Sequence, residues 1–330
     1  MTPRRLAGWA GALLATAALA VTLGAAALRW WPALQTDSLA LLAVAGVSDV
    51  LVAGALVAAV VGAGAAGWAG APGGRWWLAA PVLPLVVLVS TSWPTLVGLA
   101  RTEDPPPGPT VRVVAQNVWR ENPEPGRAAE VLLGTDADVL VLSELTPAMA
   151  RALRRAGADE AYPYRVVRAR SDADGMAVLS RVPFTSGRQR SRYRTQVVLH
   201  PAGARPVDLV GVHLPSPTRV GLGTWEQEYD RLRSLVVGLG PGVVVAGDFN
   251  GSAALVPFRA LVSAAGLRDA QDSGGGGFRP TWSEVGRVPP LLRLDHVLVT
   301  GATGVADFGF VPLTGSDHRG VEAALRLRRL

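Results

Sequence analysis

The chain has 330 residues, 49% of them hydrophobic, and a formal net charge of +6 at pH 7. It contains no cysteine, which excludes a disulfide framework and thiolate chemistry. It also contains no lysine, and we attribute this exclusive use of arginine to coding bias, so the positive charge alone is not a nucleic-acid signature. The length predicts about two domains.

The composition changes near residue 100. Residues 1–100 contain only four arginines and two acidic residues and are otherwise dominated by Ala, Leu, Val and Gly. Residues 101–109 are rich in proline, which is typical of a stiff, extended linker. Residues 110–330 have the composition of a soluble domain and are numerous enough to bury a core. We therefore expect a transmembrane region, a linker and one folded domain.

Three apolar segments in the first region are each long enough to cross a bilayer, which takes roughly 20 apolar residues in a helix. They cover about residues 7–28, 39–69 and 77–100, and tryptophans stand at their edges, as expected at a membrane interface. We predict an N-terminal bundle of about three transmembrane helices. A cleavable signal peptide is the alternative for the first segment, although this segment is longer than the usual apolar core of about 7–15 residues.

The arginines of the first region predict its orientation. Arg4, Arg5 and Arg75 would lie on one side of a three-span bundle, and Arg29 on the other. Because arginine favours the cytoplasmic side, we expect a multi-pass protein of the cell membrane whose N-terminus is cytoplasmic and whose folded domain is extracytoplasmic. Asp49 lies within the second segment, and we expect it near the end of a span or against a neighbouring helix, not at a functional site.

The soluble half begins with strand and helix patterns in alternation. Residues 111–118 predict a strand that ends in Gln116–Asn117, and residues 126–133 predict a helix. Residues 138–142 predict a second strand, which ends at Ser143–Glu144. A strand–helix–strand start is typical of a layered α/β fold. The next predicted elements are a surface helix and two strands, over residues 147–156, 164–168 and 175–180.

An arginine-rich stretch follows at residues 181–194. It carries Arg181, Arg188, Arg190, Arg192 and Arg194 and no acidic residue. It fits a solvated hairpin, and it equally fits a surface that faces phosphate groups of nucleic acid or of anionic lipid. On the second interpretation, Arg188 and Arg190 are candidate substrate-binding residues.

The strand over residues 243–250, VVVAGDFN, is the stretch around which we expect the domain to be organised. It is an apolar, β-branched run bounded by glycine, which fits a buried strand better than a helix. Asp248 and Asn250 at its C-terminal end point the same way, because side chains alternate faces with a period of two. A polar turn after a strand is common, so the importance of this pair depends on partners elsewhere in the chain.

Other predicted strand ends supply such partners. The remaining predicted elements are strands over residues 196–199, 207–212, 293–300 and 321–327, helices over 224–239 and 257–265, and a glycine loop over 273–278. His213 follows one of these strands, Asp295 lies at the start of another, and His318 precedes the last.

The residue types at these strand ends indicate one kind of chemistry. Carboxylate and amide oxygens in the absence of cysteine favour a hard cation such as Mg²⁺ or Mn²⁺. A histidine beside a carboxylate is held in one tautomer while it moves a proton. Together they indicate metal-assisted attack of water on phosphorus.

Six short motifs occur in order along residues 110–330. They are QN at Gln116–Asn117, SE at Ser143–Glu144, VH at Val212–His213, GDFN at Gly247–Asn250, RLDH at Arg293–His296 and SDH at Ser316–His318. In this order they resemble the endonuclease/exonuclease/phosphatase superfamily, which includes deoxyribonuclease-I-like nucleases, abasic-site endonucleases, bacterial sphingomyelinases and inositol-polyphosphate phosphatases. The resemblance implies a four-layer α/β sandwich, in which two packed mixed β-sheets are flanked by helices and the site lies at one sheet edge.

The resemblance also implies roles for individual residues. Glu144 corresponds to the principal metal ligand, with Asn117 nearby, and Asp317 corresponds to a residue near the metal or at a second metal position. His318 corresponds to the histidine that activates water, and Asp295 to the carboxylate that orients it.

Three further positions complete the implied site. Asp248 and Asn250 correspond to the pair that positions the nucleophile and the phosphoryl oxygens. His213 corresponds to a second histidine, which acts as leaving-group acid or phosphate ligand. His296 is expected to pack or to make a structural hydrogen bond, and His200 to lie at the surface.

Two departures from the family pattern bear on these expectations. Gly320 stands where relatives commonly have proline, which affects loop rigidity and not chemistry. The Cys-Asp-Arg motif of inositol phosphatases is absent at residues 293–296, which argues against a phosphoinositide 5-phosphatase.

We therefore expect a membrane-anchored, metal-dependent phosphodiesterase that acts outside the cytoplasm on a phospholipid headgroup, nucleic acid or a nucleotide. Its expected partners are this phosphodiester substrate and the lipid bilayer, and no protein partner is evident. The alternative is a catalytically silent binding or scaffold protein that retains the fold, against which the intact set of acids, amides and histidines argues. The loops that would select the substrate carry no recognisable motif.

Overall fold

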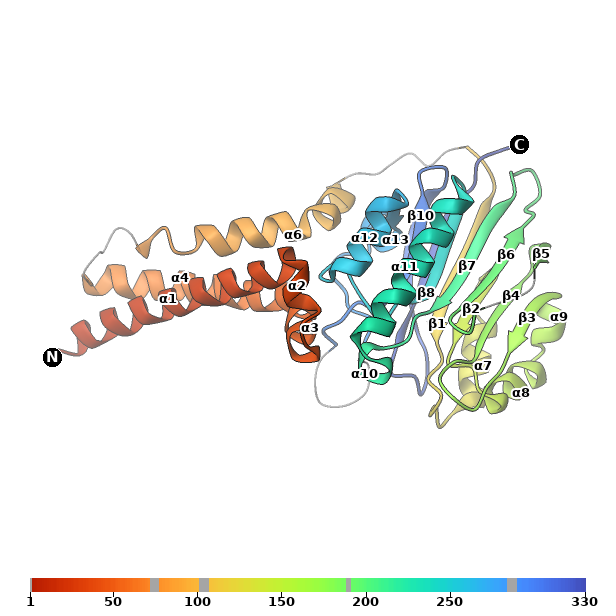
Figure 1. Ribbon diagram of the computed structural model, residues 1–330, viewed down its shortest axis with the longest axis horizontal. Helices are drawn as coiled ribbons and strands as arrows, with labels where there is room; N and C mark the ends of the chain where they lie inside the picture. Colours follow the sequence, from red (N-terminus) through yellow and green to blue (C-terminus); the bar gives the residue numbers. More distant parts are fainter. Residues whose placement is uncertain (1, 72–76, 101–106, 188–190, 284–289) are drawn as a thin grey trace. The chain divides into compact units, whose positions relative to one another are not determined.

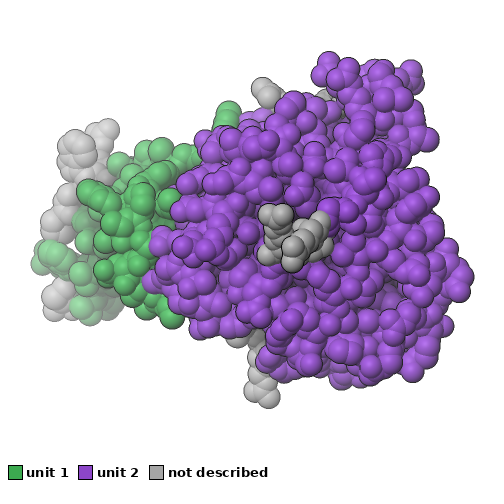
Figure 2. Space-filling view, turned by 45° about the vertical axis from the view of Figure 1, so that its right-hand side comes forward, with its two compact units in different colours: residues 1–94, 253–256 green, residues 95–252, 257–330 purple. Residues whose placement is uncertain are grey.

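A computed structural model describes residues 2–71, 77–100, 107–187, 191–283 and 290–330 of the chain (Figure 1). The chain divides into two compact units, which are coloured separately in Figure 2. Unit 1 comprises residues 1–94 and 253–256, and unit 2 comprises residues 95–252 and 257–330. Each unit has its own buried apolar clusters.

Unit 1 is helical. Its helices are α1 (Pro3–Trp30), α2 (Pro32–Gln35), α3 (Leu39–Gly46) and α4 (Ser48–Ala69), and α6 (Val82–Ala100) begins in this unit. Pro3 suits the first turn of α1, where an N–H would have no helical partner, and Thr2 caps this helix by accepting a hydrogen bond from Arg5 N. α4 ends at Gly70, whose φ of 63° is the left-handed conformation common at helix C-termini.

α1 and α4 pack through small side chains. Gly11 and Gly62 lie so close that a Cβ added to either would stand 2.6 Å from the carbonyl oxygen of the other. The large apolar side chains lie outside instead: Leu13 is 68% exposed and Val57 65%. Small residues at the contact are typical of helices that associate in lipid, whereas a helix pair in water buries its large apolar side chains. Buried alanines complete the contact: Ala15, Ala18, Ala55, Ala59 and Ala66.

An ion pair joins neighbouring ends of these two helices. Arg29, in the last turn of α1, donates from Nη1 to Oδ1 of Asp49 at 3.1 Å, and Asp49 lies in the first turn of α4. The Arg29 side chain is buried, whereas that of Asp49 is half exposed. Asp49 therefore lies at a helix end and against a neighbouring helix, in agreement with the sequence analysis.

The prediction of about three membrane-spanning helices needs correction. Among the described residues, two helices are long and apolar enough to cross a membrane, α1 and α4, and a signal sequence or a core helix can have the same length and composition. The second predicted segment is divided at Val47, which separates α3 from α4. The third overlaps α6, which begins at Val82.

Unit 2 is built on two six-stranded mixed β-sheets. The first sheet has the order β11-β12-β1-β2-β4-β3 and the second β5-β6-β7-β8-β10-β9. The first sheet contains β1 (Thr110–Asn117), β2 (Val139–Ser143), β3 (Tyr164–Arg168), β4 (Met176–Ser180), β11 (Gly304–Pro312) and β12 (Arg319–Arg326). The second contains β5 (Phe184–Ser186), β6 (Arg194–Leu199), β7 (Val207–His213), β8 (Val243–Asp248), β9 (Leu267–Asp269) and β10 (Asp295–Thr300). β1 and β2 run parallel, as do β7 and β8.

The two sheets pack face to face, and helices cover their outer faces (Figure 1). Inward-facing side chains of both sheets, among them Val113, Val141, Val244 and Val297, form one buried cluster. α7 (Pro125–Leu133), α8 (Pro147–Arg155) and α9 (Ala158–Ala161) cover the first sheet. α11 (Leu222–Leu239) and α12 (Val256–Ala264) cover the second, while α10 (Pro217–Val220) and α13 (Ala270–Ser273) are single turns. The predicted four-layer α/β sandwich is thus confirmed.

Three strands have no counterpart in the sequence analysis: β5, β9 and β11. β5 and β9 have three residues each, too few for an alternating pattern to be visible. β11 lies at the edge of its sheet, and a register shift between Val305 and Asp307 interrupts its period of two. All three are edge strands, so no second neighbouring strand requires them to be continuously apolar.

Gly247 allows β8 to approach β7 at the functional end of the sheet. Its φ is 142°, a conformation that other residues rarely adopt, and a Cβ there would stand 1.9 Å from the carbonyl oxygen of Val212. Gly247 pairs with Val212 in the sheet, and the next pair is His213 with Asp248. This close approach therefore sets the spacing of two candidate catalytic residues.

We predict that Gly247→Ala lowers the free energy of unfolding by about 2–4 kcal/mol, because backbone strain and displacement of a central strand act together. The matched control is Gly238→Ala on α11, where an added Cβ meets nothing within 4 Å and alanine favours the helix. Denaturant unfolding of the full chain, followed by tryptophan fluorescence, compares the two variants. A loss at Gly247 no larger than that at Gly238 would contradict the prediction.

Candidate active site

Asp248 lies at the centre of an edge where polar residues from both sheets meet. In the register of the second sheet it pairs with His213 of β7 and with Asp295 of β10. Its side chain is only 1% exposed. Oδ1 accepts a hydrogen bond from Asn250 N at 2.8 Å, and Oδ2 accepts one from Asn117 Nδ2 at 3.0 Å. Since Asn117 belongs to the first sheet, the Asp248 carboxylate connects the two sheets.

Asn117 bridges two carboxylates. Its Nδ2 donates to Oε1 of Glu144 at 3.2 Å as well as to Asp248, and its Oδ1 accepts from Trp119 N at 2.9 Å. Glu144 has a φ of 55°, unusual for a residue other than glycine, and its Oε2 accepts from Arg120 N at 3.0 Å. These contacts fix the Glu144 carboxylate close to Asp248. The Asn117 oxygen has a second lone pair beside the one that accepts from Trp119 N.

His318 and Asp295 form a buried pair. His318 Nδ1 lies 2.7 Å from Asp295 Oδ2, and Thr281 Oγ1 accepts a hydrogen bond from Asp295 N at 3.1 Å. Burial opposes the protonation of His318, but the charges of Asp295 and Asp248 outweigh it and raise the pKa of His318 to about 10. Its Nε2 lies 3.9 Å from Asp248 Oδ2 and is the ring nitrogen left to exchange a proton with a ligand.

The turn before β12 holds His318 against the first sheet. Ser316 Oγ donates to Asn117 O at 2.7 Å and accepts from His318 N at 3.1 Å. Gln116 Nε2 donates to the carbonyl oxygens of Asn117, at 2.6 Å, and of His318, at 3.1 Å. Gly320 leaves room for this glutamine, because a Cβ there would stand 2.2 Å from Gln116 Oε1. The QN and SDH motifs are thus bonded to each other.

His213 faces two carboxylates through one ring nitrogen. Its Nε2 lies 3.7 Å from Asp248 Oδ2 and 3.9 Å from Glu144 Oε1. Its Nδ1 is buried and has no hydrogen-bond partner among the residues that the structure describes. Its backbone N–H donates to Tyr193 O at 2.9 Å, which fixes the end of β7. His213 and His318 therefore both present Nε2 to Asp248.

Asp317 lies beside this group. Trp282 Nε1 donates to its Oδ2 at 3.1 Å, while its Oδ1 is buried without a hydrogen-bond partner in the described ranges. Burial raises the pKa of Asp317; the charge of His318 and the Trp282 hydrogen bond oppose this increase, and the charge of Glu144 adds to it. Asp317 thus lies close enough to Glu144 for the charge of Glu144 to act on it.

The donor set fits a hard divalent cation. Asp248, Asp295 and His318 each offer one ligand atom, and these atoms all lie within 4.8 Å of one another, which is close enough to hold a metal ion. Asp295 Oδ2 also contacts His318 Nδ1, and Glu144 adjoins Asp248 through the amide of Asn117. Oxygen donors of this kind suit Mg²⁺ or Mn²⁺.

The two remaining histidines lie outside this group. His296 Nδ1 contacts Asp269 Oδ2 at 2.5 Å, and its ring packs against Phe258 with centroids 4.5 Å apart. It has the structural role expected of it. His200 is exposed at the end of β6.

The candidate substrate-binding residues Arg188 and Arg190 lie outside the described residues. Elsewhere in the same arginine-rich stretch, Arg194 is largely buried and forms an ion pair with Glu228 at 3.5 Å. Arg192, by contrast, is half exposed. The stretch therefore contains at least one structural arginine and one that can meet a ligand.

Two aromatic residues of α11 support the site and are missing from the sequence analysis. Tyr229 OH donates to Phe249 O at 2.9 Å, and Trp225 Nε1 donates to Asn250 O at 3.3 Å. Gly251 makes this approach possible, because a Cβ there would stand 2.2 Å from the Tyr229 hydroxyl. Their spacing of four along a helix is visible in the sequence, but it does not distinguish a supporting residue from an ordinary core residue.

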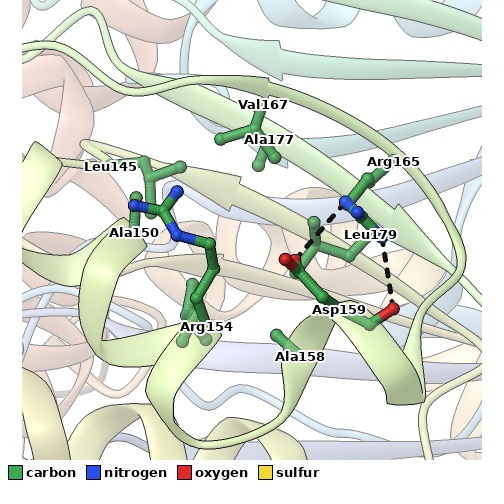
Figure 3. A pocket seen from close by; sticks show the side chains of 10 residues that line it. Leu145, Ala150, Arg154, Ala158, Asp159, Arg165, Val167, Ala177 and Leu179 are labelled. Carbon is green, nitrogen blue, oxygen red and sulfur yellow. Dashed lines mark hydrogen bonds and ion pairs between the residues drawn. The ribbon is translucent and has the colours of Figure 1, made fainter.

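A separate pocket lies on the outer face of the first sheet, against α8 and α9 (Figure 3). It has a volume of about 270 Å³ and an apolar lining that includes Leu145 and Leu179. Arg154 and the Asp159–Arg165 ion pair, at 3.4 Å, supply its polar lining. None of the candidate catalytic residues lines this pocket, so we do not assign the reaction to it.

A family model described as "Endonuclease/Exonuclease/phosphatase family" matches residues 114–318 of the chain. The match includes every candidate catalytic and metal-binding position from Asn117 to His318. A search of curated proteins found no match.

Solved structures of the same fold come from several organisms. An endonuclease/exonuclease/phosphatase from Beutenbergia cavernae has 21% identity and a TM-score of 0.52, covering 66% of this chain and 72% of that one. Truncated TDP2 from Caenorhabditis elegans has 20% identity and a TM-score of 0.50, with coverage of 66% and 98%. Sphingomyelinase C from Streptomyces griseocarneus has 20% identity and a TM-score of 0.47, with coverage of 66% and 99%. At such identities the likeness concerns the fold alone.

The pKa of His318 provides a test of the buried pair. Because this pKa is raised, the bound proton stabilises the folded chain fully below about pH 6.5, and this stabilisation is lost as the pH rises through about 10. We predict that Asp295→Asn lowers the pKa of His318 and flattens this decline in stability. The chain has four histidines, so NMR of selectively ¹³C-labelled imidazoles can follow each one, with His318→Ala for assignment. An unchanged pKa in Asp295→Asn would contradict the pairing.

Proposed function

Because the chain belongs to the endonuclease/exonuclease/phosphatase family, we propose that it is a metal-dependent phosphodiesterase, anchored in a membrane, that hydrolyses a phosphate ester by attack of water. The proposed substrate is a phosphodiester of a lipid headgroup, of nucleic acid or of a nucleotide. Mg²⁺ or Mn²⁺ is the proposed cofactor, since the donors are carboxylate oxygens.

One observation carries this proposal: two imidazoles and two carboxylates from different strands converge within hydrogen-bonding or ion-pair range. Asp248 Oδ2 lies 3.7 Å from His213 Nε2 and 3.9 Å from His318 Nε2, and His213 Nε2 lies 3.9 Å from Glu144 Oε1. A protein that only binds ligands has no need to bury an imidazole–carboxylate pair beside two further carboxylates. Perturbed titratable groups of this kind are typical of catalytic sites.

His318 is proposed to hold or accept a proton at Nε2. Asp295 occupies its Nδ1 and therefore fixes both the tautomer and the orientation of the ring. With a pKa of about 10, His318 carries its proton at neutral pH and can stabilise a negative phosphoryl oxygen. To accept a proton from water, it must first lose part of the field of Asp248 and Asp295, because that field is what raises its pKa.

Glu144, Asp248 and Asp317 are proposed to hold the cation, with Asn117 beside them. When bound, the cation would supply Lewis-acid polarisation of a phosphoryl oxygen and offset the charge of these carboxylates. Asn117 keeps Glu144 and Asp248 together, since its Nδ2 donates to both.

His213 is proposed to protonate the leaving group or to bind a phosphoryl oxygen. Its Nε2 faces Asp248 and Glu144, so this ring nitrogen is the one directed into the site. Asn250 Nδ2 donates to Leu214 O at 2.8 Å, which ties the loop after β8 to the loop after β7. Asp248 and Asn250 thus position the groups that would surround the phosphate.

The membrane anchor is proposed from the helices of unit 1. α1 and α4 contact each other through glycine and alanine and expose large apolar side chains such as Leu13, Val57 and Val61. A lipid environment accommodates that surface, whereas water does not. The arginine bias then assigns the N-terminus to the cytoplasm. With α1 and α4 as the two spans, residues 110–330 would return to the cytoplasmic side, and an extracytoplasmic domain would require the segment of α6 to cross the membrane as well.

We predict that Glu144→Gln lowers phosphodiester hydrolysis by at least about 100-fold and weakens Mg²⁺ binding, because a neutral amide does not balance the cation. The control is Glu130→Gln on the exposed face of α7. Hydrolysis is measured on lipid, DNA, RNA and nucleotide diesters, and Mg²⁺ binding by calorimetry. Unchanged Mg²⁺ affinity would refute the ligand assignment, and a wild-type chain inactive on every diester would favour the catalytically silent alternative.

A fusion experiment tests the proposed topology. We predict that alkaline phosphatase, which is active only outside the cytoplasm, is active when fused after Leu330. Green fluorescent protein exported in unfolded form through the general secretion pathway should be dark at the same position. An inactive phosphatase and a fluorescent protein that is bright would contradict the extracytoplasmic placement and agree with two spans, α1 and α4.

A further inference from the structure

A buried aspartate holds two arginines beside the candidate active site. The Asp174 side chain is 3% exposed; its Oδ1 accepts from Arg219 Nη1 at 2.7 Å, and its Oδ2 lies 2.9 Å from Arg192 Nε. Both guanidinium groups also lie over the ring of Tyr193, 5.8 and 5.9 Å from its centroid. We call Asp174, Arg192, Tyr193 and Arg219 the Asp174 cluster.

The Asp174 cluster is tied to the catalytic edge through both sheets. On the first sheet, Gly175 O accepts a hydrogen bond from Leu145 N at 3.0 Å, and Leu145 directly follows Glu144. On the second sheet, Tyr193 O accepts from His213 N at 2.9 Å. The cluster therefore adjoins the strand ends that carry Glu144 and His213.

The cluster has an excess of positive charge. The neighbouring Arg170–Asp172 ion pair, at 2.7 Å, joins it through a hydrogen bond of 3.1 Å from Asp174 N to Asp172 Oδ1, so three arginines face two aspartates. The side chains of Arg192 and Arg219 are 54% and 36% exposed, which leaves N–H donors accessible to a ligand. Asp174 holds both guanidinium groups in place beforehand, which reduces the conformational entropy that these side chains lose when a ligand binds.

The arginines of the cluster are not partners of the catalytic carboxylates. Among the described residues, the acidic group that both guanidinium groups contact is Asp174, not Glu144 or Asp248. A reacting phosphate lies among Glu144, Asp248 and the two histidines according to the proposed function. The cluster is therefore placed to meet a different anionic group of the same substrate.

We infer that the Asp174 cluster is a subsite for a second phosphate group, next to the diester that is hydrolysed. Guanidinium forks bind phosphate oxygens in pairs, and two forks held over one ring offer several donors to one tetrahedral anion. This inference rests on the proposed phosphodiesterase function. The second phosphate belongs either to a neighbouring nucleotide or to a phosphorylated lipid headgroup, and the chemistry recognised is the same.

Two nucleotide substrates that differ by one phosphate test the subsite: thymidine 5′-(p-nitrophenyl phosphate) and its 3′-phosphorylated form. With the full chain in detergent and Mg²⁺ or Mn²⁺, we expect kcat/KM to be at least about tenfold higher for the 3′-phosphorylated substrate, equivalent to about 1.4 kcal/mol. Arg219→Gln and Arg192→Gln should each remove most of this preference while leaving the other substrate within about twofold.

Two further variants keep the test specific. Arg233→Gln on α11 removes an arginine that pairs only with Asp230 among the described contacts, at 2.9 Å, and should retain the full preference. Arg219→Lys keeps the positive charge but loses the two-pronged guanidinium group, and this variant should retain part of the preference for the 3′-phosphorylated substrate. Variants that keep the preference, or that lose equally on both substrates, would overturn the inference, as would a wild-type chain that shows no preference either with these nucleotides or with the corresponding lipid pair.

Binding measurements separate this inference from the proposed function. If the wild-type chain hydrolyses no nucleotide, nucleic-acid or lipid diester, the phosphodiesterase proposal fails, and the subsite is judged by calorimetric binding of thymidine 3′,5′-bisphosphate against thymidine 5′-monophosphate. A bisphosphate preference that Arg219→Gln abolishes supports the subsite, and its absence overturns it.

A lipid pair identifies the source of the second phosphate. Phosphatidylinositol and phosphatidylinositol 4-phosphate in mixed micelles also differ by one phosphate. The preference for the additional phosphate, lost in Arg219→Gln, can occur in only one of the two pairs. If it occurs in the lipid pair alone, the second phosphate belongs to a lipid headgroup. If it occurs in the nucleotide pair alone, the second phosphate belongs to nucleic acid. No such preference in either pair overturns the inference.

Discussion

The burial of one carboxylate, Asp248, is the constraint on which the rest of the site depends. Removing a charge from water costs several kcal/mol unless hydrogen bonds and opposite charges compensate it. Here the compensation comes from the amide of Asn117, the backbone of Asn250, and the imidazoles of His213 and His318. These partners come from different strands and from both sheets. The catalytic edge and the packing of the two sheets are therefore stabilised together, and a shift of one sheet against the other would leave the carboxylate uncompensated.

The strand register delivers these partners without long connections. Parallel strands end at the same edge, so the pairing of Asn117 with Ser143 brings Glu144 beside Asn117, and the pairing of β7 with β8 sets His213 against Asp248. β10 and β12 run antiparallel to their neighbours and begin at that edge, which brings Asp295 and His318 there. The face-to-face packing of the sheets then joins the two sets (Figure 1). The site is thus a consequence of topology, and its precision comes from rigid strand ends.

The sequence predicts the central strands well because each is a continuous apolar run that ends in a polar residue, as at Asp248. Of the edge strands it predicts β3 but not β5, β9 or β11, since a half-exposed strand need not be apolar. Nor does it predict side-chain pairings between distant segments: Asp174 and Arg219 are 45 positions apart, and no periodicity relates them. The sequence can nominate Asn117 as a metal ligand from its residue type, but only geometry shows that its oxygen already accepts from Trp119 and that its nitrogen faces the carboxylates.

The helices of unit 1 follow a packing rule opposite to that of unit 2, and this difference bears on the fate of the first segment. A pair of helices that buries glycine and alanine gains little from the hydrophobic effect, which scales with apolar area removed from water at roughly 25 cal/mol per Å². Its association depends on close backbone approach, as between Gly11 and Gly62, and on surroundings that accommodate Leu13 and Val57 outside. Cleavage after α1 would leave Gly62 and the alanines of α4 without the surface that they contact. The two helices are therefore complementary to each other, and the proposed membrane anchor depends on both.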